Sequence, residues 1–344
     1  MITGHKGYIG SVMVPVVRAA GYDVTGLDTG YFSECTLPIS EAAVPEVIKD
    51  IRDLTVEDLA GYDAVIHLAA LSNDPIGNLN LAWTEEINRN GSIRLAELAK
   101  AAGVERFIFS SSCIMYGMTE TAVVTEDSPL DPQTEYARSK VDSERAITKM
   151  ADDGFSPTFM RNGTVYGLSP RMRLDTVLND FVAQALTTGK VVVMSDGKPW
   201  RPVIHVADVA RAFVHVLGAP RELIHNQAFN NGADDLNYQI IELAQFATEA
   251  VPDSVLEVRA TSGADQRTYK ADFGKFKRTF PDFAFEWNAR SGAAELYQGY
   301  LNVGLTREDC DGNRYVRLRW LNAMLAAGSL DSSLRWARRT VNAS

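Results

Sequence analysis

A glycine-rich segment at the start of the chain limits its fold more than any other feature. Residues 3–10 follow the pattern TGxxGxxG, and a helical pattern comes directly after them. In such a turn Gly4 permits the tight bend, Gly7 lets a phosphate approach the backbone, and Gly10 lets helix and strand pack closely. The start of the helix also offers free N–H groups to an anion. The pattern predicts a dinucleotide site formed by Gly4, Gly7, Tyr8, Ile9 and Gly10.

An acidic residue at the end of the next strand narrows the choice of dinucleotide. Asp28 follows the apolar run 24–27, about twenty residues after the glycines. A carboxylate there can bind both ribose hydroxyls and repels a 2′-phosphate, which favours NAD over NADP. The alternative is a solvated turn residue. Only Met1 and Ile2 precede Thr3, so we expect the first strand to be short.

The first half of the chain alternates strand and helix patterns. Short apolar runs predict buried strands at 24–27, 64–68 and 106–109, and three- or four-residue spacing of apolar residues predicts helices at 11–20, 85–102 and 135–150. Such alternation is typical of an α/β protein with a doubly wound parallel sheet, the Rossmann arrangement.

The second half is less regular and predicts a smaller, interleaved C-terminal lobe. Its strands are expected at 191–194 and 203–206, and its helices at 175–188, 206–217 and 237–250. We expect residues 1–165 to form the NAD-binding domain, with 202–232 returning to it. The substrate-binding lobe would comprise 166–201 and 233–344, including a helical tail after residue 313 to which the sequence assigns no role.

Composition limits the partners. The formal net charge of −10 disfavours a general affinity for nucleic acid or membranes, because both are polyanionic. Cys35, Cys113 and Cys310 are an odd number without metal-ligand spacing, which indicates a reducing cytoplasm, no disulfide framework and no metal site. No apolar run has the length of a membrane span, and no signal peptide is recognisable.

A tyrosine and a lysine provide a candidate catalytic pair. Tyr136 and Lys140 form the pattern YxxxK within a predicted helix, so both side chains lie on one face. An ammonium group beside a phenol stabilises the phenolate, which can then accept a proton from an alcohol. Ser112 ends a serine cluster that closes a buried strand, where its hydroxyl could hold the same oxygen. Without that serine, a surface Tyr–Lys pair would be the simpler interpretation.

Together these motifs resemble the extended short-chain dehydrogenases/reductases, and most closely the NAD-dependent epimerase/dehydratase family that acts on nucleotide sugars. Further matching residues are Asp50 and Ile51, the run from His67 to Ala70, and Tyr116 with Gly117; the resemblance covers residues 1 to roughly 290. It implies NAD as cofactor, a nucleotide sugar as substrate, and a homodimer formed through the helices at 85–102 and 135–150.

The resemblance also implies residue roles. Asp50 and Ile51 would contact adenine, while Leu68, Ala69 and Ala70 would line the cofactor cleft beside Tyr136 and Lys140. Ser112 would be the catalytic hydroxyl, Arg201 would bind the substrate's diphosphate, and Arg267 would be a second such arginine. Thr164 would contact the substrate at a position where many relatives carry asparagine. For both arginines an exposed structural role is the alternative.

The residues after Ser112 separate the possible reactions. Dehydratases of the family carry Asp-Glu there, and decarboxylases a Glu, whereas this chain has Cys113 and Ile114, neither of which can replace a carboxylate. Some 3,5-epimerases use a nearby cysteine as base, but Cys113 is one position too early and would face away as a buried apolar residue. Epimerisation of a nucleotide sugar at carbon 4 is therefore favoured. The alternatives are an NAD(P)H-dependent 4-keto-sugar reductase and, less favoured, a 3,5-epimerase, a dehydratase or a non-catalytic sensor.

Overall fold

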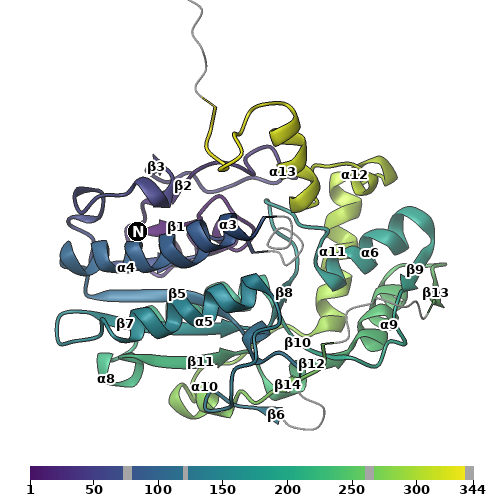
Figure 1. Cartoon of the computed structure of the whole chain (residues 1–344). Helices are drawn as coiled ribbons and strands as arrows, with labels where there is room; N and C mark the ends of the chain where they lie inside the picture. The colour runs from purple at the N-terminus through teal and green to yellow at the C-terminus, as the bar shows by residue number, and fades with distance from the viewer. Residues whose placement is uncertain (73–79, 119–122, 260–266, 338–344) are drawn as a thin grey trace, which may run out of the picture.

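A seven-stranded parallel sheet forms the centre of the molecule (Figure 1). The computed structural model describes residues 1–72, 80–118, 123–259 and 267–337. The strand order is β11-β7-β5-β4-β1-β2-β3, and every neighbouring pair is parallel. The strands are β1 (Ile2–Thr3), β2 (Gly26–Asp28), β3 (Glu46–Ile48), β4 (Ala64–His67), β5 (Arg106–Ser112), β7 (Ser156–Asn162) and β11 (Gln227–Asn231). The predicted doubly wound α/β fold is confirmed.

Continuous apolar runs form the central strands because both faces of the sheet are covered. Successive side chains point to opposite faces. Phe107 and Phe109 of β5 therefore join one core cluster, while Ile108 between them joins the cluster on the other face. All three side chains are fully buried.

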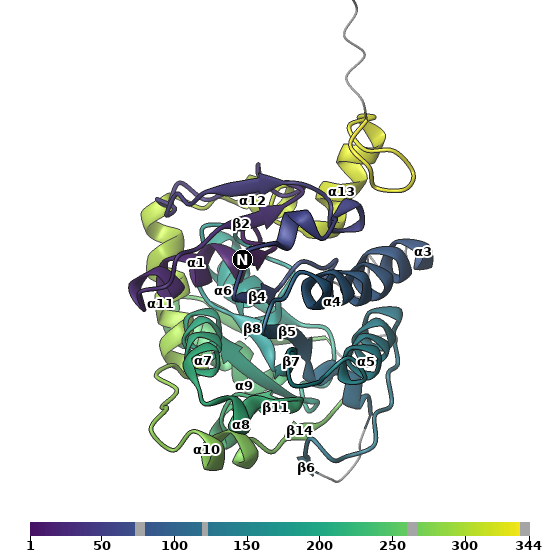
Figure 2. The same cartoon turned by 90° about the vertical axis from the view of Figure 1, so that its left-hand side faces the viewer.

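Helices cover the sheet on both sides (Figure 2). On one face α1 (Gly10–Ala19) packs against α7 (Val206–Gly218), and on the other α4 (Gly91–Ala101) packs against α5 (Glu135–Thr148). The helix predicted over 85–102 is present, but α4 is preceded there by a π-helix over Thr84–Asn90. Within its wider turns, the buried Asn88 accepts a hydrogen bond from the Leu71 backbone nitrogen (2.8 Å) and donates one to its carbonyl (3.0 Å).

In the described part of the chain, three smaller sheets and four further helices are formed mainly by residues after position 160. One sheet has the order β12-β10-β8, a second pairs β13 with β9, and a third pairs β14 with β6. The strands are β6 (Val123–Val124), β8 (Thr164–Tyr166), β9 (Lys190–Val193), β10 (Trp200–His205), β12 (Asn237–Gln239), β13 (Val255–Val258) and β14 (Lys270–Ala271). The helices are α6 (Val177–Thr188), α9 (Ile240–Ala250), α10 (Gly274–Thr279) and α11 (Ala289–Val303).

The helix expected at 237–250 begins later than predicted, because residues 237–239 pair with β10 instead. Tyr238 lies opposite Arg201 in that antiparallel pairing. Backbone hydrogen bonds between β12 and β10 therefore replace the first helical turn that the sequence pattern predicts. The division of the chain into 1–165 with 202–232, and 166–201 with 233–344, stays a prediction.

The C-terminal tail returns to the edge of the large sheet. After α12 (Arg307–Asp311), α13 (Arg317–Ala326) lies next to the chain segment that follows β2 (Figure 1). Leu321 and Met324 of α13 belong to the same core cluster as Leu27 of β2, and the Trp320 indole donates a 2.7 Å hydrogen bond to the Tyr31 carbonyl. The tail therefore packs against the half of the sheet that carries the glycine-rich turn.

Short elements complete the described chain. They are the helices α3 (Leu81–Trp83) and α8 (Arg221–Ile224) and the 3₁₀ turns Ile51–Asp53, Glu57–Leu59, Cys113–Tyr116 and Asp234–Leu236. Among the described residues, no helix is both long and apolar enough to cross a membrane.

Candidate active site

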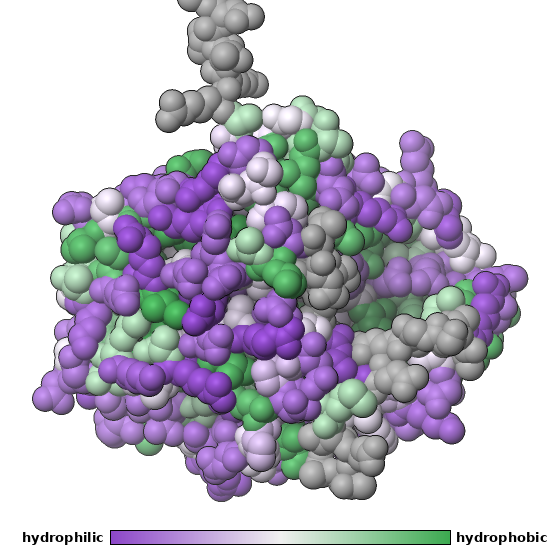
Figure 3. Space-filling view, viewed as in Figure 1, coloured by the Kyte–Doolittle hydropathy of each residue, from purple (hydrophilic) through white to green (hydrophobic). Residues whose placement is uncertain are grey.

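A cavity of about 1070 Å³ lies at the carboxyl ends of the parallel strands, between the large sheet and the second half of the chain. Figure 3 shows the surface hollowed over the region of α6, one of the helices that line the cavity. In an open α/β sheet this is the usual place for a ligand. Every site residue predicted from the sequence lines this one cavity: Gly4, Gly7, Tyr8, Ile9, Gly10, Asp28, Asp50, Ile51, Leu68, Ala69, Ala70, Ser112, Tyr136, Lys140, Thr164, Arg201 and Arg267. Their individual roles stay predictions.

The glycine-rich turn, called the glycine cradle below, is packed so closely that side chains at Gly4 and Gly10 would collide with neighbouring backbone atoms. Gly4 has a φ of +75°, and a Cβ atom added there would lie 2.7 Å from the Ala69 nitrogen. A Cβ on Gly10 would lie 2.2 Å from the Gly4 carbonyl oxygen. The N-terminus of α1 has no side-chain cap and no acidic residue in its first turn. These features fit a dinucleotide whose diphosphate lies at the helix N-terminus.

Asp28 lies beside this turn with its carboxylate held in place. One oxygen accepts a 3.0 Å hydrogen bond from the Lys6 backbone nitrogen, and the other accepts a 2.8 Å bond from that of Gly30. Each carboxylate oxygen can accept further hydrogen bonds. The position fits a ribose next to the diphosphate, as NAD requires.

Asp50 and Ile51 line the same end of the cavity. The Arg52 guanidinium bonds both carboxylate oxygens of Asp50, at 3.0 Å from Nε and 2.7 Å from Nη2. Burial opposes the charged form of Asp50, but the hydrogen bonds from Arg52 hold its pKa below the usual value. The Asp50 carboxylate is thus a charged hydrogen-bond acceptor with a fixed orientation at this end of the cavity.

The catalytic candidates meet at the end of β5. Helix α5 is capped by the Thr134 hydroxyl, which accepts a 3.2 Å hydrogen bond from the Ala137 nitrogen. Its Lys140 is buried, and its Nζ atom donates a 2.7 Å bond to the Ser110 carbonyl and lies 5.7 Å from the centre of the Tyr136 ring. Burial lowers the pKa of Lys140 to about 8. A cation therefore lies close to the phenol, as proton transfer requires.

Ser112 lies in the cavity wall, whereas its neighbour Cys113 faces away. The Ser112 hydroxyl accepts a 3.3 Å hydrogen bond from the Ile114 nitrogen, and both residues line the cavity. Cys113 is fully buried, with its sulfur 3.1 Å from the Arg161 carbonyl oxygen. Burial raises the pKa of its thiol well above the usual value. Such a thiol is a poor base.

The residues predicted to bind substrate line the cavity from two neighbouring strands. Thr164 belongs to β8 and Arg201 to β10, and these two strands pair with each other. The Arg201 guanidinium donates hydrogen bonds to the carbonyls of Trp200 (2.9 Å) and Arg267. The two predicted arginines therefore lie next to each other.

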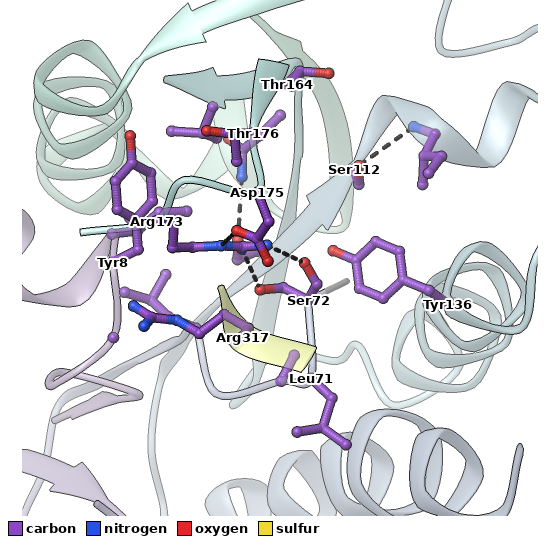
Figure 4. Close-up of a pocket in the computed structure, with 18 of the residues that line it drawn as sticks. Tyr8, Leu71, Ser72, Ser112, Tyr136, Thr164, Arg173, Asp175, Thr176 and Arg317 are labelled. Atoms are coloured by element: carbon purple, nitrogen blue, oxygen red, sulfur yellow. Dashed lines mark hydrogen bonds and ion pairs between the residues drawn. The ribbon is translucent and has the colours of Figure 1, made fainter. Parts of the chain in front are cut away.

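Several polar cavity residues were missed by the sequence reasoning. Arg173 forms an ion pair with Asp175 (2.8 Å) and donates to the Ser72 hydroxyl (2.9 Å), as Figure 4 shows. Asp180 also lines the cavity, and burial raises its pKa to about 6. The charged residues that follow Tyr166 and Gly167 at 171, 173 and 175 were a usable signal. Arg317, which reaches the cavity from α13, had none.

Comparison with known proteins places these motifs in a family. A family model described as the NAD dependent epimerase/dehydratase family matches residues 1–232. The chain is 28% identical over 296 residues to a UDP-glucose 4-epimerase of Corynebacterium glutamicum, covering 81% of this chain and 88% of that protein. It is also 28% identical over 291 residues to a dTDP-glucose 4,6-dehydratase of Streptomyces griseus, covering 81% and 87%.

A solved structure resembles this chain over most of its length. MoeE5 in complex with UDP-glucuronic acid and NAD superposes with a TM-score of 0.74 at 26% identity, covering 88% of this chain and 98% of the other. The glycine cradle and Asp28 fit the same cofactor. The chain belongs to the NAD-dependent epimerase/dehydratase family, and its cofactor is NAD.

Proposed function

We propose that the protein interconverts two nucleotide sugars that differ in configuration at carbon 4. The observation that carries the proposal is the convergence of Ser112, Tyr136 and Lys140 on one cavity with the glycine cradle, while no carboxylate directly follows Ser112. Oxidation and return of the hydride need only these three side chains and retained NAD. The similarity to UDP-glucose 4-epimerases supports this reaction, and it makes UDP-glucose the first substrate to test.

In this proposal, the chain's own residues move one proton and hold one oxygen. Bound NAD supplies the hydride acceptor. The Tyr136 phenolate accepts the proton of the sugar hydroxyl and later returns it, while the Ser112 hydroxyl holds the same oxygen. The Lys140 ammonium, fixed by the Ser110 carbonyl, favours the phenolate by its charge. The keto sugar rotates in the site before the hydride returns, so the hydride adds to the opposite face of carbon 4.

Dehydration is disfavoured by the groups next to Ser112. A dehydratase must remove a hydroxyl together with a proton, which needs an acid and a base at that place. Here Ile114 lines the cavity and Cys113 is buried away from it. The carboxylate of Asp175, elsewhere in the cavity, is paired with Arg173.

The test combines cofactor analysis with an isomerisation assay. The purified protein is denatured and the released dinucleotide is identified by mass spectrometry; we expect close to one NAD or NADH per chain. Conversion of UDP-glucose to UDP-galactose is then followed without added cofactor. Tyr136→Phe should abolish turnover and keep the bound NAD, while the exposed Tyr22→Phe serves as matched control.

The same test separates the alternatives. Turnover that consumes added NADPH stoichiometrically would favour a 4-keto-sugar reductase, and a product lighter by one water would favour a dehydratase. A Tyr136→Phe variant with full turnover would contradict all of these reactions as written. A homodimer, a cytoplasmic location and a role in carbohydrate biosynthesis stay predictions, and sedimentation analysis tests the first.

A further inference from the structure

An arginine from the C-terminal tail reaches the wall of the cofactor cavity. Arg317, the first residue of α13, is 4% exposed and lines the cavity although most of its neighbours there come from the first half of the chain. Its Nη2 atom donates a 2.8 Å hydrogen bond to the Arg171 carbonyl, and its guanidinium lies over the Phe32 ring at 4.6 Å. These contacts fix the position of the side chain.

The charge of Arg317 is not balanced by a direct partner. Among the described residues, Arg171 has an ion pair with Glu41 and Arg173 has one with Asp175, but no carboxylate pairs with Arg317. Its Nη1 atom is buried without a hydrogen-bond partner. An unpaired cation held out of water is costly unless an anion meets it. The nearby Arg173–Asp175 pair places one charge of each sign beside Arg317, so it does not neutralise the guanidinium.

The surroundings of Arg317 show which anion can meet it. The segment that carries Arg171 is attached to the glycine-rich turn: the Ser169 hydroxyl donates 2.8 Å to the Tyr8 carbonyl, and the Tyr8 hydroxyl donates 2.7 Å to the Gly167 carbonyl. On the other side, Phe32 follows closely after Asp28 in the chain. Arg317 thus contacts two segments, one attached to the turn that fits a diphosphate and one that follows the carboxylate that fits the adenosine ribose. Figure 4 shows Arg317, Arg173 and Tyr8 on one side of the cavity and Tyr136 with Ser112 on the other.

We propose that the Arg317 guanidinium binds the diphosphate of NAD, so that the tail helix α13 takes part in holding the cofactor. The tail is well anchored for this task. The Trp320 indole donates to the Tyr31 carbonyl (2.7 Å), and the Trp336 indole donates to the Thr29 carbonyl (2.7 Å). The proposal depends on this cavity being the cofactor site and is independent of which sugar is converted.

The experiment compares ligands with and without phosphate. Affinities of the cofactor-stripped protein for ADP, adenosine and UDP are measured by isothermal titration for the wild type, Arg317→Met and Arg317→Lys. The matched control is Arg319→Met, which removes an exposed arginine of the same helix. The NAD retained by each freshly purified variant is quantified in parallel, and near-ultraviolet circular dichroism checks that each variant is folded.

For Arg317→Met we expect about a 10-fold weaker affinity for ADP, the effect of one lost hydrogen bond to a charged group. Adenosine and UDP should bind as in the wild type, less NAD should be retained, and Arg317→Lys should lie in between. Unchanged ADP affinity, or equal losses for ADP and adenosine, would overturn the proposal. A loss confined to UDP would assign Arg317 to the substrate's diphosphate and overturn it as well. A wild type that binds neither ADP nor NAD would instead overturn the cofactor site itself.

Discussion

The Nζ atom of Lys140 donates a 2.7 Å hydrogen bond to the backbone carbonyl of Ser110. The bond joins the middle of α5 to the end of β5, so the lysine of the YxxxK motif is fixed relative to the strand that carries Ser112. Phe109 of the same strand packs against the ammonium group at 4.6 Å from its ring centre. A charged group held in this way can stabilise the Tyr136 phenolate without first having to change its conformation.

Removing this ammonium should abolish most of the activity. We expect Lys140→Met to lower kcat by about 10²- to 10⁴-fold, since the proton acceptor loses the charge that favours its reactive form. Lys149→Met, at an exposed position just after the same helix, should leave kcat unchanged. Turnover of UDP-glucose with retained cofactor measures the difference. If Lys140→Met kept the wild-type kcat, Lys140 would have no role in the reaction.

The pH dependence should report the same group. Burial lowers the pKa of Lys140 from its model-compound value of 10.5 to about 8, so its positive charge is present below about pH 8 and is lost as the pH rises through that value. Turnover that depends on the ammonium should therefore fall on the alkaline side with an apparent pKa near 8. A kcat profile measured between about pH 6 and pH 10 tests this. In Lys140→Met the alkaline step should be absent from the residual activity.

A methyl group in the glycine-rich turn should empty the cofactor site. A Cβ on Gly10 would lie 2.2 Å from the Gly4 carbonyl and 2.6 Å from the His5 Cα, both backbone atoms, so the turn must move. We expect Gly10→Ala to lose bound NAD and to unfold about 1–3 kcal/mol more easily. Gly154→Ala is the control, since its Cβ would meet nothing nearer than 3.7 Å. Urea unfolding and cofactor content measure both effects, and a stable Gly10→Ala protein with full NAD content would contradict this account.

The choice between NAD and NADP should depend on Asp28. Its carboxylate is fixed by the backbone nitrogens of Lys6 and Gly30 at the ribose end of the site. Asp28→Ser removes the charge that repels a 2′-phosphate and the acceptor for the ribose hydroxyls. NAD affinity should fall about 10-fold while the preference for NAD over NADP narrows, as fluorescence titration of both dinucleotides can show. Asp23→Ser, an exposed change just before β2, should alter neither affinity.

Removing the acidic partner of a buried ion pair on α5 should strongly destabilise the fold. The Arg161 guanidinium bonds the Glu144 carboxylate at 2.7 Å and the Tyr116 hydroxyl at 2.9 Å, and both charged side chains are less than a tenth exposed. Glu144→Ala leaves that guanidinium buried and unpaired, so we expect a loss of about 3–5 kcal/mol in the free energy of unfolding. Glu97→Ala, exposed on α4, should change it by less than about 0.5 kcal/mol in the same urea titration. Equal effects of the two substitutions would show that the pair contributes no more than a surface charge.

Local sequence patterns were enough to predict strands β1, β2, β4 and β5 of the large sheet and the candidate site residues near their carboxyl ends, but not β3, β7 or β11. The glycine turn, Asp28, the run after β4, Ser112 and the YxxxK pair are all local patterns, and each is tied to the end of a strand or the start of a helix. Because parallel strands end at one edge of the sheet, predicting the strands was enough to bring these residues together. The alternation of Phe107 and Ile108 likewise shows in sequence why both faces of the sheet are covered.

How distant parts of the chain meet follows from long-range packing. The tail pattern predicts a helix, but nothing local indicates that Arg317 enters the cofactor cavity or that Trp320 bonds Tyr31, 289 residues earlier in the chain. The same holds for the pairing of Tyr238 with Arg201, which turns the start of a predicted helix into a strand. Hydrophobic periodicity shows that one face of an element must be covered. The partner that covers it is selected by long-range packing, and the local spacing of apolar residues does not identify that partner.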